Sequence, residues 1–306
     1  MAVKYAGVDI SAWQTNVDYN KLKNATIAGS KNKFVFIRCA YGTTEDKMFK
    51  KHVEGCIKAG LNVGLYLYSI ARTPDAAKKE AEFVISLIKK YNLDGKITYP
   101  IAYDLEEESI AKLGKNLCTS LVLSFCDTIK SYNYYPIVYT NFNWLYWAKN
   151  IDRDAIVKAG YEFWIAGYIA QSRTTAYKED ISIWQHSVAG HPSFDIAGIK
   201  AVDGVAGQCD CNWSYVAYAS KIKKLGMNKF KPKKYNLTVK ANGVTVTVRN
   251  KLSAILRAMN SGAKFSAVVR YNCTGTITDL SEKDAESRKQ SLQKEGFQVV
   301  LTEVDE

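Results

Sequence analysis

The fold is decided by the stretch from residue 33 to residue 70, which reads KFVFIRCAYGTTEDKMFKKHVEGCIKAGLNVGLYLYSI. Its two ends, residues 33–41 and 62–70, are rich in β-branched, aromatic and aliphatic side chains, which favours buried strands. The segment 46–60 between them repeats apolar residues three and four positions apart, as an amphipathic helix does. Two strands joined by a helix form a βαβ unit, and such units build parallel sheets.

The same alternation continues along most of the chain. Further amphipathic helices are expected at residues 73–92 and 109–130. Other apolar runs predict strands at 4–11, 98–106, 135–141, 162–169, 181–187 and near 203–211. Roughly eight strands separated by helices predict an α/β fold, a (β/α)8-like barrel. Because the helices become short or absent after residue 141, we expect the second half of the barrel to be degenerate.

The chain changes character after residue 226. Residues 227–235, MNKFKPKKY, are Lys-rich and contain a proline, which predicts an exposed linker after a barrel domain at 1–226. Residues 236–306 predict a second, smaller α+β domain. Its expected order is ββαβαβ, with a hairpin turn at Asn242-Gly243, a helix at 251–263, a strand at 264–272, a helix at 281–296 and a strand at 297–304.

Composition places the chain among globular proteins. It is 47% hydrophobic, and no apolar run is long enough to span a bilayer, so no membrane insertion is expected. The formal net charge of +12 suits approach to any polyanion and selects none. The seven cysteines are odd in number and form no CxxC pair, which predicts reduced and mostly buried thiols. The N-terminus lacks the pattern of a signal peptide, so we expect residence in a bacterial cytoplasm.

Two acids stand out where the predicted strand 98–106 ends. Residues two apart in a strand point to the same face, so Asp104 and Glu106 project together, with Cα atoms about 6.6 Å apart. In β/α barrels the catalytic groups lie at the C-terminal ends of strands. Paired carboxylates suit glycoside hydrolysis, in which one acid donates a proton and the other stays ionised beside the developing positive charge. The sequence therefore makes this pair the candidate catalytic centre.

Other predicted strand ends add acids and aromatic side chains. Asp9 ends the first strand and Asp210 lies in the last, and these two strands must adjoin when a barrel closes. Aromatic rings stack on the apolar faces of sugars, while acids and amides bind hydroxyl groups. The aromatic candidates for a saccharide groove include Trp13, Tyr41, Tyr66, Tyr68, Tyr139, Trp164, Tyr168 and Trp184.

An ordered set of motifs makes the similarity specific. Eight motifs within residues 4–215 resemble those of the glycoside hydrolase family 25 lysozymes, which include many phage endolysins. In chain order they are GVDISAWQ, FVFIRCAYGT, VGLYLYS, IAYDLEE, IVYTN, FWIAGY, IWQHS and GQCDCNW. The resemblance implies a flattened β/α barrel that cleaves the β-1,4 bond between N-acetylmuramic acid and N-acetylglucosamine in peptidoglycan. It also implies a phage endolysin of a Gram-positive, clostridial-type host, held in the host cytoplasm until lysis.

The resemblance assigns roles to particular residues. It implies that Glu106 is the general acid, Asp104 its partner carboxylate, and Asp9 and Asp210 supporting acids. It also implies that Arg38, Tyr66, Tyr139, Trp164, Tyr168 and Gln185 line or brace the site, to which the aromatic pattern adds Tyr41 and Trp184. Whether Asp104 attacks as a nucleophile or orients the substrate's acetamido group stays open, because the strand spacing lies between those of retaining and inverting enzymes.

Competing functions are a catalytically inactive saccharide-binding protein, a host autolysin and a nucleic-acid-binding protein. The acidic groove and the lack of a known nucleic-acid module disfavour the last. No nucleotide-binding or metal-ligand motif occurs, so no cofactor is expected. The second domain is expected to bind a cell-wall polymer, with an oligomerisation role as the alternative. Met227 leaves open whether internal initiation produces this domain by itself.

Overall fold

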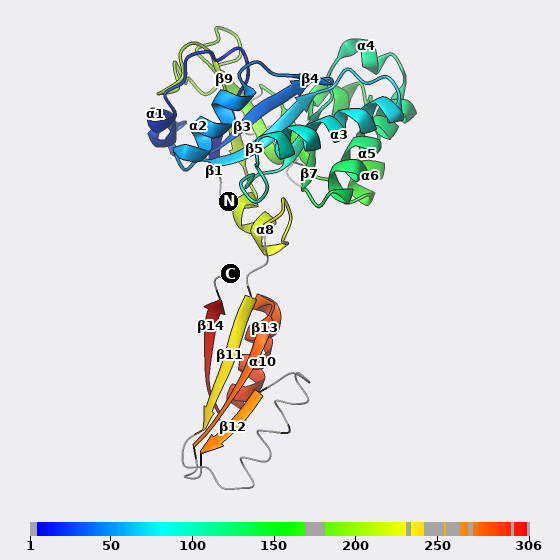
Figure 1. Cartoon of the computed structure of the whole chain (residues 1–306). Helices are drawn as coiled ribbons and strands as arrows, with labels where there is room; N and C mark the ends of the chain where they lie inside the picture. Colours follow the sequence, from blue (N-terminus) through cyan, green and yellow to red (C-terminus); the bar gives the residue numbers. More distant parts are fainter. Residues whose placement is uncertain are drawn as a thin grey trace. The chain divides into compact units, whose positions relative to one another are not determined.

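The computed structural model divides the chain into two compact units, Met1–Phe230 and Lys231–Glu306 (Figure 1). The structure describes residues 5–168, 181–230, 234–241, 254, 264–268, 272–294 and 297–304. The first unit contains the barrel, and the second contains a separate small sheet. Each unit has its own sheet, and they are described in turn.

A closed barrel of eight strands forms the first unit. Around the barrel, each paired with the next, the strands are β1 (Tyr5–Ile10), β3 (Ser30–Tyr41), β5 (Asn62–Tyr68), β6 (Ile101–Asp104), β7 (Pro136–Asn141), β8 (Phe163–Ala166), β9 (Ile181–Ala189) and β10 (Cys209–Ser214). All are parallel except β10, which runs antiparallel to both β9 and β1. The short strands β2 (Thr26–Ile27) and β4 (Thr44–Glu45) pair with β3. The predicted barrel is thus confirmed, with one strand reversed.

Alternation along the strands separates two apolar clusters. On β3, Phe34 and Phe36 belong to a cluster that contains no residue of the long outer helices, which places them inside the barrel. Val35 and Ile37 point the other way, into the cluster shared with those helices. Arg38 continues the inward set of β3 at its C-terminal end. The same two-residue period brings an inward side chain to the mouth of the barrel from each strand.

Helices cover the outside of the barrel, except that α8 packs Tyr218 and Ile222 against the inner cluster. They are α1 (Tyr19–Asn24), α2 (Phe49–Lys58), α3 (Pro74–Lys90), α4 (Glu108–Ala111), α5 (Lys115–Ser131), α6 (Arg153–Lys158) and α8 (Tyr218–Lys224), with a π-helix η1 (Asn143–Trp147) after β7. Pro74 opens α3 and the Thr73 hydroxyl accepts the Ala76 N–H, so this helix begins where its sequence predicts. The predicted helix 109–130 is instead two helices, because Gly114 has a φ of 88° that helical geometry excludes.

The second half of the barrel has the predicted degenerate form. The connection between β9 and β10, residues 190–208, is described throughout and contains turns but no helix. The last strand begins at Cys209, later than predicted, and it is antiparallel. Because antiparallel neighbours need no crossover helix, this connection without a helix allows the reversal.

The first unit extends beyond its predicted boundary. Residues 227–230, which the sequence assigns to the linker, belong to the barrel unit. The Asn228 side chain is buried, and its Nδ2 donates to the main-chain carbonyl oxygens of Ile97 and Tyr99. Its Oδ1 accepts the Tyr135 N–H. A buried amide with three partners fixes this segment to the barrel, so the linker prediction is wrong for these four residues.

The second unit is a four-stranded antiparallel sheet of order β12-β13-β11-β14 with one described long helix. Its elements are β11 (Lys234–Ala241), β12 (Lys264–Val268), β13 (Asn272–Leu280), α10 (Glu282–Lys294) and β14 (Gln298–Val304). The predicted order omitted β13, whose sequence NCTGTITDL carries few apolar residues and a glycine and so lacks a strong strand pattern. The predicted turn at Asn242-Gly243 lies outside the described residues, as does the predicted helix at 251–263 except for Ala254, which is helical.

Two further sequence predictions concern the whole chain. The six cysteines within the described side chains are all unpaired and buried, as predicted. In the part of the chain that the structure describes, no helix has the length and apolar character to cross a membrane.

Candidate active site

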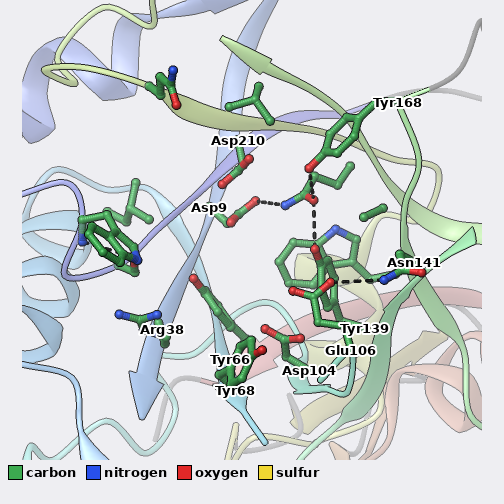
Figure 2. A pocket seen from close by; sticks show the side chains of 18 of the residues that line it. Asp9, Arg38, Tyr66, Tyr68, Asp104, Glu106, Tyr139, Asn141, Tyr168 and Asp210 are labelled. Atoms are coloured by element: carbon green, nitrogen blue, oxygen red, sulfur yellow. Dashed lines mark hydrogen bonds between the residues drawn. The ribbon is translucent and has the colours of Figure 1, made fainter. Parts of the chain in front are cut away.

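A cavity of about 940 Å³ opens at the mouth of the barrel, where the parallel strands end. Side chains from all eight barrel strands line it, together with Tyr168 just after β8 (Figure 2). The four predicted catalytic acids, Asp9, Asp104, Glu106 and Asp210, all face this space. The reversed strand β10 contributes Asp210 from near its start, because the start of β10 lies beside the C-terminal end of β1.

The end of β6 presents Asp104 and Glu106 together, as the sequence predicts. Main-chain bonds fix this segment: the Ser69 N–H donates to the Asp104 carbonyl, and the Leu105 N–H donates to the Tyr139 carbonyl. Leu105 is buried on the opposite face, so the two acids project into the cavity. Among the described residues, the buried Oδ1 of Asp104 has no hydrogen-bond partner. A buried oxygen of this kind is available to a ligand.

Glu106 has a single side-chain partner in the described structure. Asn141, at the end of β7, points its Nδ2 at Glu106 Oε2 at a distance of 3.4 Å. The Oδ1 of Asn141 accepts the Trp144 N–H at 3.1 Å, which fixes the orientation of the amide. Asn141 was missed by the sequence analysis, although it closes the predicted strand 135–141 and the strand-end rule could have selected it.

Asp9 is held by two amide groups. Gln185 Nε2 and Asn212 Nδ2 both donate to Asp9 Oδ2, at 2.9 and 2.8 Å. The Gln185 amide is oriented by its oxygen, because Oε1 accepts hydrogen bonds from the hydroxyls of Tyr139 and Tyr168 at 2.9 and 3.0 Å. Figure 2 shows the bonds that join Asp9, Tyr139 and Tyr168 through one amide, that of Gln185. Together with the Asn212 bond they hold one oxygen of Asp9 in a fixed position.

The Asn212 amide is oriented in the same manner. Its Oδ1 accepts the indole N–H of Trp164 at 2.8 Å, so Nδ2 must face Asp9. Asp210 lies directly opposite Asp9 in the β1–β10 register. The neighbouring strands that close the barrel therefore bring two carboxyl groups together.

Burial raises the pKa of all four acids, as desolvation disfavours a charged carboxylate. The pKa of Asp9 is raised to about 6, with the bonds from Asn212 and Gln185 opposing the effect of burial. The pKa of Asp104 is raised well above its usual value, first by burial and then by the charges of Glu106 and Asp9, against which Arg38 acts. Burial, and then the nearby charge of Asp9, likewise raise the pKa values of Glu106 and Asp210. The site can hold protons near neutral pH.

Most of the predicted binding residues lie where the sequence places them. Those that line the cavity are Arg38, Tyr66, Tyr139, Trp164, Tyr168 and Gln185. Arg38 is oriented by Asp46, whose Oδ2 accepts the Arg38 Nε–H at 2.7 Å. This ion pair leaves the far end of the guanidinium in the wall of the cavity.

Tyr41 and Trp184 do not line the cavity. Tyr41 is 47% exposed and stacks on Tyr68, with ring centroids 5.2 Å apart. Trp184 is 3% exposed, packs in the outer apolar cluster and donates its indole N–H to the Gly167 carbonyl. Trp184 alternates with the inward Gln185, so its side chain must point away from the barrel axis. Neither side chain therefore stands in the cavity wall, where the sequence predicts it.

Several lining residues were not predicted. Besides Asn141 they include Gln14, Phe142, Asn143, Trp147 and Gln208. Most come from loops and from the π-helix η1, which carry no periodic signal in the sequence. Within the described part of the chain, no group of three His, Cys, Asp or Glu side chains could hold a metal ion.

The sequence is similar to known proteins. It matches the model of glycosyl hydrolases family 25 over residues 8–193, which is more than half of the chain. The chain belongs to glycosyl hydrolases family 25. One relative is the autolytic lysozyme of Clostridium acetobutylicum. It is 27% identical over 205 residues, which are 67% of this chain and 54% of that protein. The chain thus spans about half the length of the curated relative it matches.

Solved structures support the same barrel fold for this family 25 chain. The modular autolysin LytC of Streptococcus pneumoniae has a TM-score of 0.54 at 24% identity, covering 69% of this chain and 46% of that one. The CTP1L endolysin has a TM-score of 0.55 at 22% identity, covering 72% and 69%. The lysozyme of Streptomyces coelicolor has a TM-score of 0.54 at 21% identity, covering 74% and 98%. At these identities the likeness establishes the fold.

Proposed function

We propose that the barrel unit hydrolyses the β-1,4 bond between N-acetylmuramic acid and N-acetylglucosamine in bacterial peptidoglycan. The observation that carries the proposal is the pair Asp104 and Glu106, which face one cavity from one strand end and both have raised pKa values. Family 25 membership and the similarity to an autolytic lysozyme support a cell-wall substrate.

In the proposed mechanism Glu106 is the general acid and Asp104 supports the 2-acetamido group of the substrate. The two acids lie close enough for the charge of Glu106 to raise the pKa of Asp104, so ionisation of one acid favours the protonated form of the other. An acetamido N–H that donates to the unpartnered Asp104 Oδ1 stabilises the ionised form of Asp104, which leaves the proton on Glu106.

The reaction then follows from these protonation states. Glu106 gives its proton to the glycosidic oxygen as the bond to the leaving sugar breaks. The acetamido oxygen closes on the anomeric carbon, and Asp104 stabilises the cationic ring that forms. The ionised Glu106 next takes a proton from water, whose oxygen opens the ring with net retention. A first product in the α-anomeric form would contradict this mechanism and indicate inversion.

The test is digestion of purified peptidoglycan with identification of the new reducing sugar. Muramic acid is expected; glucosamine would indicate a glucosaminidase, and new free amino groups an amidase or peptidase. Glu106→Gln should lower kcat by about 10²–10⁴ because the proton donor is lost. The neighbouring Glu108→Gln, on the exposed start of α4, is the matched control and should keep its activity. A Glu106→Gln variant that clears cell walls as well as the parent would favour a saccharide-binding protein without catalysis.

We further propose that the protein acts as an endolysin, released from the cytoplasm of a clostridial-type host at lysis. Similarity to a clostridial autolytic lysozyme and to endolysin folds supports this biological setting. The test is inducible expression with and without a pore-forming protein in the membrane. Lysis that requires the pore is expected, and lysis without it would favour a host autolysin.

We propose that the second unit binds a secondary polymer of the cell wall and so concentrates the enzyme on its substrate. The full chain should sediment with intact walls and lose most of this binding when acid extraction removes teichoic-acid-like polymers. Unchanged binding would contradict the proposal. The terminal strands β12 and β14 of its sheet also offer edges for pairing with a second copy, which light scattering of the full chain would detect.

A further inference from the structure

The two most exposed large hydrophobic side chains among the described residues line the same cavity. Trp13 is 83% exposed and Trp147 is 63% exposed, and both stand in the wall of the candidate active site. Exposure of an indole to water is unfavourable, and aromatic side chains at a cavity typically contact a ligand.

Trp13 lies on a hydrogen-bonded turn after β1. The Trp13 N–H donates to Ser11 Oγ at 3.3 Å, and the Ser11 N–H donates to Gln14 Oε1 at 2.9 Å. The Ala12 N–H donates to the buried carboxylate of Asp46 at 3.0 Å. The Gln14 amide also donates to the Gln208 carbonyl across the cavity rim. The indole is therefore exposed on a fixed backbone, which reduces the entropy lost when a ligand binds.

Trp147 is the last residue of the π-helix η1. The Ala148 N–H donates to the Asn143 carbonyl at 2.7 Å, the five-residue spacing that defines a π-turn. Trp144 and Leu145 are buried and anchor this turn to the barrel unit. The turn leaves Trp147 at the cavity, 6.2 Å from the ring of Phe142. Isolated π-turns are rare and frequently occur at functional sites.

Strand order places the two tryptophans on opposite sides of the barrel mouth. Trp13 follows β1 and Trp147 follows β7. Around the closed barrel, β1 is separated from β7 by β3, β5 and β6 in one direction and by β10, β9 and β8 in the other. A linear ligand that touches both indoles must therefore cross the mouth, where Asp104 and Glu106 lie.

We propose that Trp13 and Trp147 are stacking platforms for sugar rings on opposite sides of the cleaved bond. This inference rests on the proposed hydrolysis of peptidoglycan. The occupant is an extended β-1,4-linked chain of amino sugars, whose rings present apolar faces to the indoles while their polar edges reach the acids and amides of the cavity. Short chains that contact only one platform are poorer substrates.

The test uses reducing-end-labelled octasaccharides of alternating N-acetylglucosamine and N-acetylmuramic acid, with the parent, Trp13→Ala and Trp147→Ala. Each variant should lower kcat/KM on the octasaccharide about tenfold, the equivalent of about 1.4 kcal/mol. Loss of each platform should also move the preferred cleavage position toward opposite ends of the chain, which a merely structural role would not do. Trp13→Phe and Trp147→Phe should partly restore both properties, because a flat ring is kept.

The matched control is Tyr132→Ala, a 43% exposed aromatic residue at the end of α5 that lies away from this cavity. It should keep the parent efficiency and cleavage pattern. If the parent cuts the octasaccharide and both tryptophan variants retain its efficiency and pattern, the platforms are refuted while the hydrolase stands. If neither the parent nor Tyr132→Ala cuts any chain, the proposed hydrolysis itself has failed.

Discussion

Asp9 and Asp104 are buried aspartates that face the same cavity from two strand ends, and the protein holds them in opposite ways. Asp9 has one oxygen fixed by the amides of Gln185 and Asn212. Asp104 has a buried oxygen with no partner among the described residues, and only Arg38 opposes the rise of its pKa. One acid is therefore satisfied by the protein, whereas the other leaves its bonding capacity to the substrate.

This difference separates an acid that organises the site from an acid that contacts the reacting substrate. An acid that accepts two oriented amides keeps its place whether or not substrate is bound. An unpartnered buried carboxylate is costly in the free enzyme, and its cost is relieved when a ligand donates to it. We therefore expect substitutions near Asp104 to change activity most, and substitutions around Asp9 to change both activity and stability.

The largest expected effect comes from Asp104→Asn. Activity on peptidoglycan should fall by about 10²–10³, because a preorganised charge beside the reacting centre is lost. The free energy of unfolding should stay the same or rise, since a buried carboxylate without a partner becomes a neutral amide. Both are measurable, by turbidity clearance and by denaturant unfolding. A variant with more than about a tenth of the parent activity would contradict the role assigned to Asp104.

A smaller effect is expected from Gln185→Met, which keeps the volume and removes the amide. The hydroxyls of Tyr139 and Tyr168 lose their acceptor and Asp9 loses a donor. The free energy of unfolding should fall by about 1–3 kcal/mol, and activity by about tenfold. The control is Gln290→Met on the exposed side of α10, which should change neither. Unchanged stability in the Gln185 variant would show that the network does not hold the site.

The pH dependence of stability sharpens the comparison further. The pKa of Asp9 is about 6 in the folded protein, raised from 3.8, so between these values the folded state binds more protons than the unfolded state. Its contribution is therefore fully present below about pH 4 and is lost as pH rises through 6. The stability of the parent minus that of Asp9→Asn should fall by on the order of 1 kcal/mol per pH unit over this window. A difference that does not change with pH would contradict the raised pKa.

The smallest effect is expected from Tyr41→Ala. Tyr41 stacks on Tyr68 outside the cavity, so its removal should change activity by less than about twofold. Tyr66→Phe is the informative comparison with Tyr41→Ala, because it removes a desolvated hydroxyl from a residue that lines the cavity. A large loss in the Tyr41 variant would mean that the substrate extends beyond the cavity wall on this side.

Prediction from the sequence succeeded where the signal is local. The two-residue period placed Asp104 and Glu106 on one face, and the three-and-four spacing located α2 and α3. The same reasoning failed at Trp184, which points into the outer apolar layer, whereas the next residue, Gln185, faces the cavity. It also missed β13 in the second unit, because its nine residues contain little apolar character.

By itself the sequence determined most strand positions of the barrel, the family and the four acids, because each depends on residue types a few positions apart. Only the tertiary structure decided that β10 runs backwards, that Asn212 reaches Asp9 from 203 positions away, and that Trp13 and Trp147 stand on opposite sides of the mouth. Those features depend on how the barrel closes. Closure is set by packing between distant segments, and no local spacing records which buried oxygen receives a partner and which is left for the substrate.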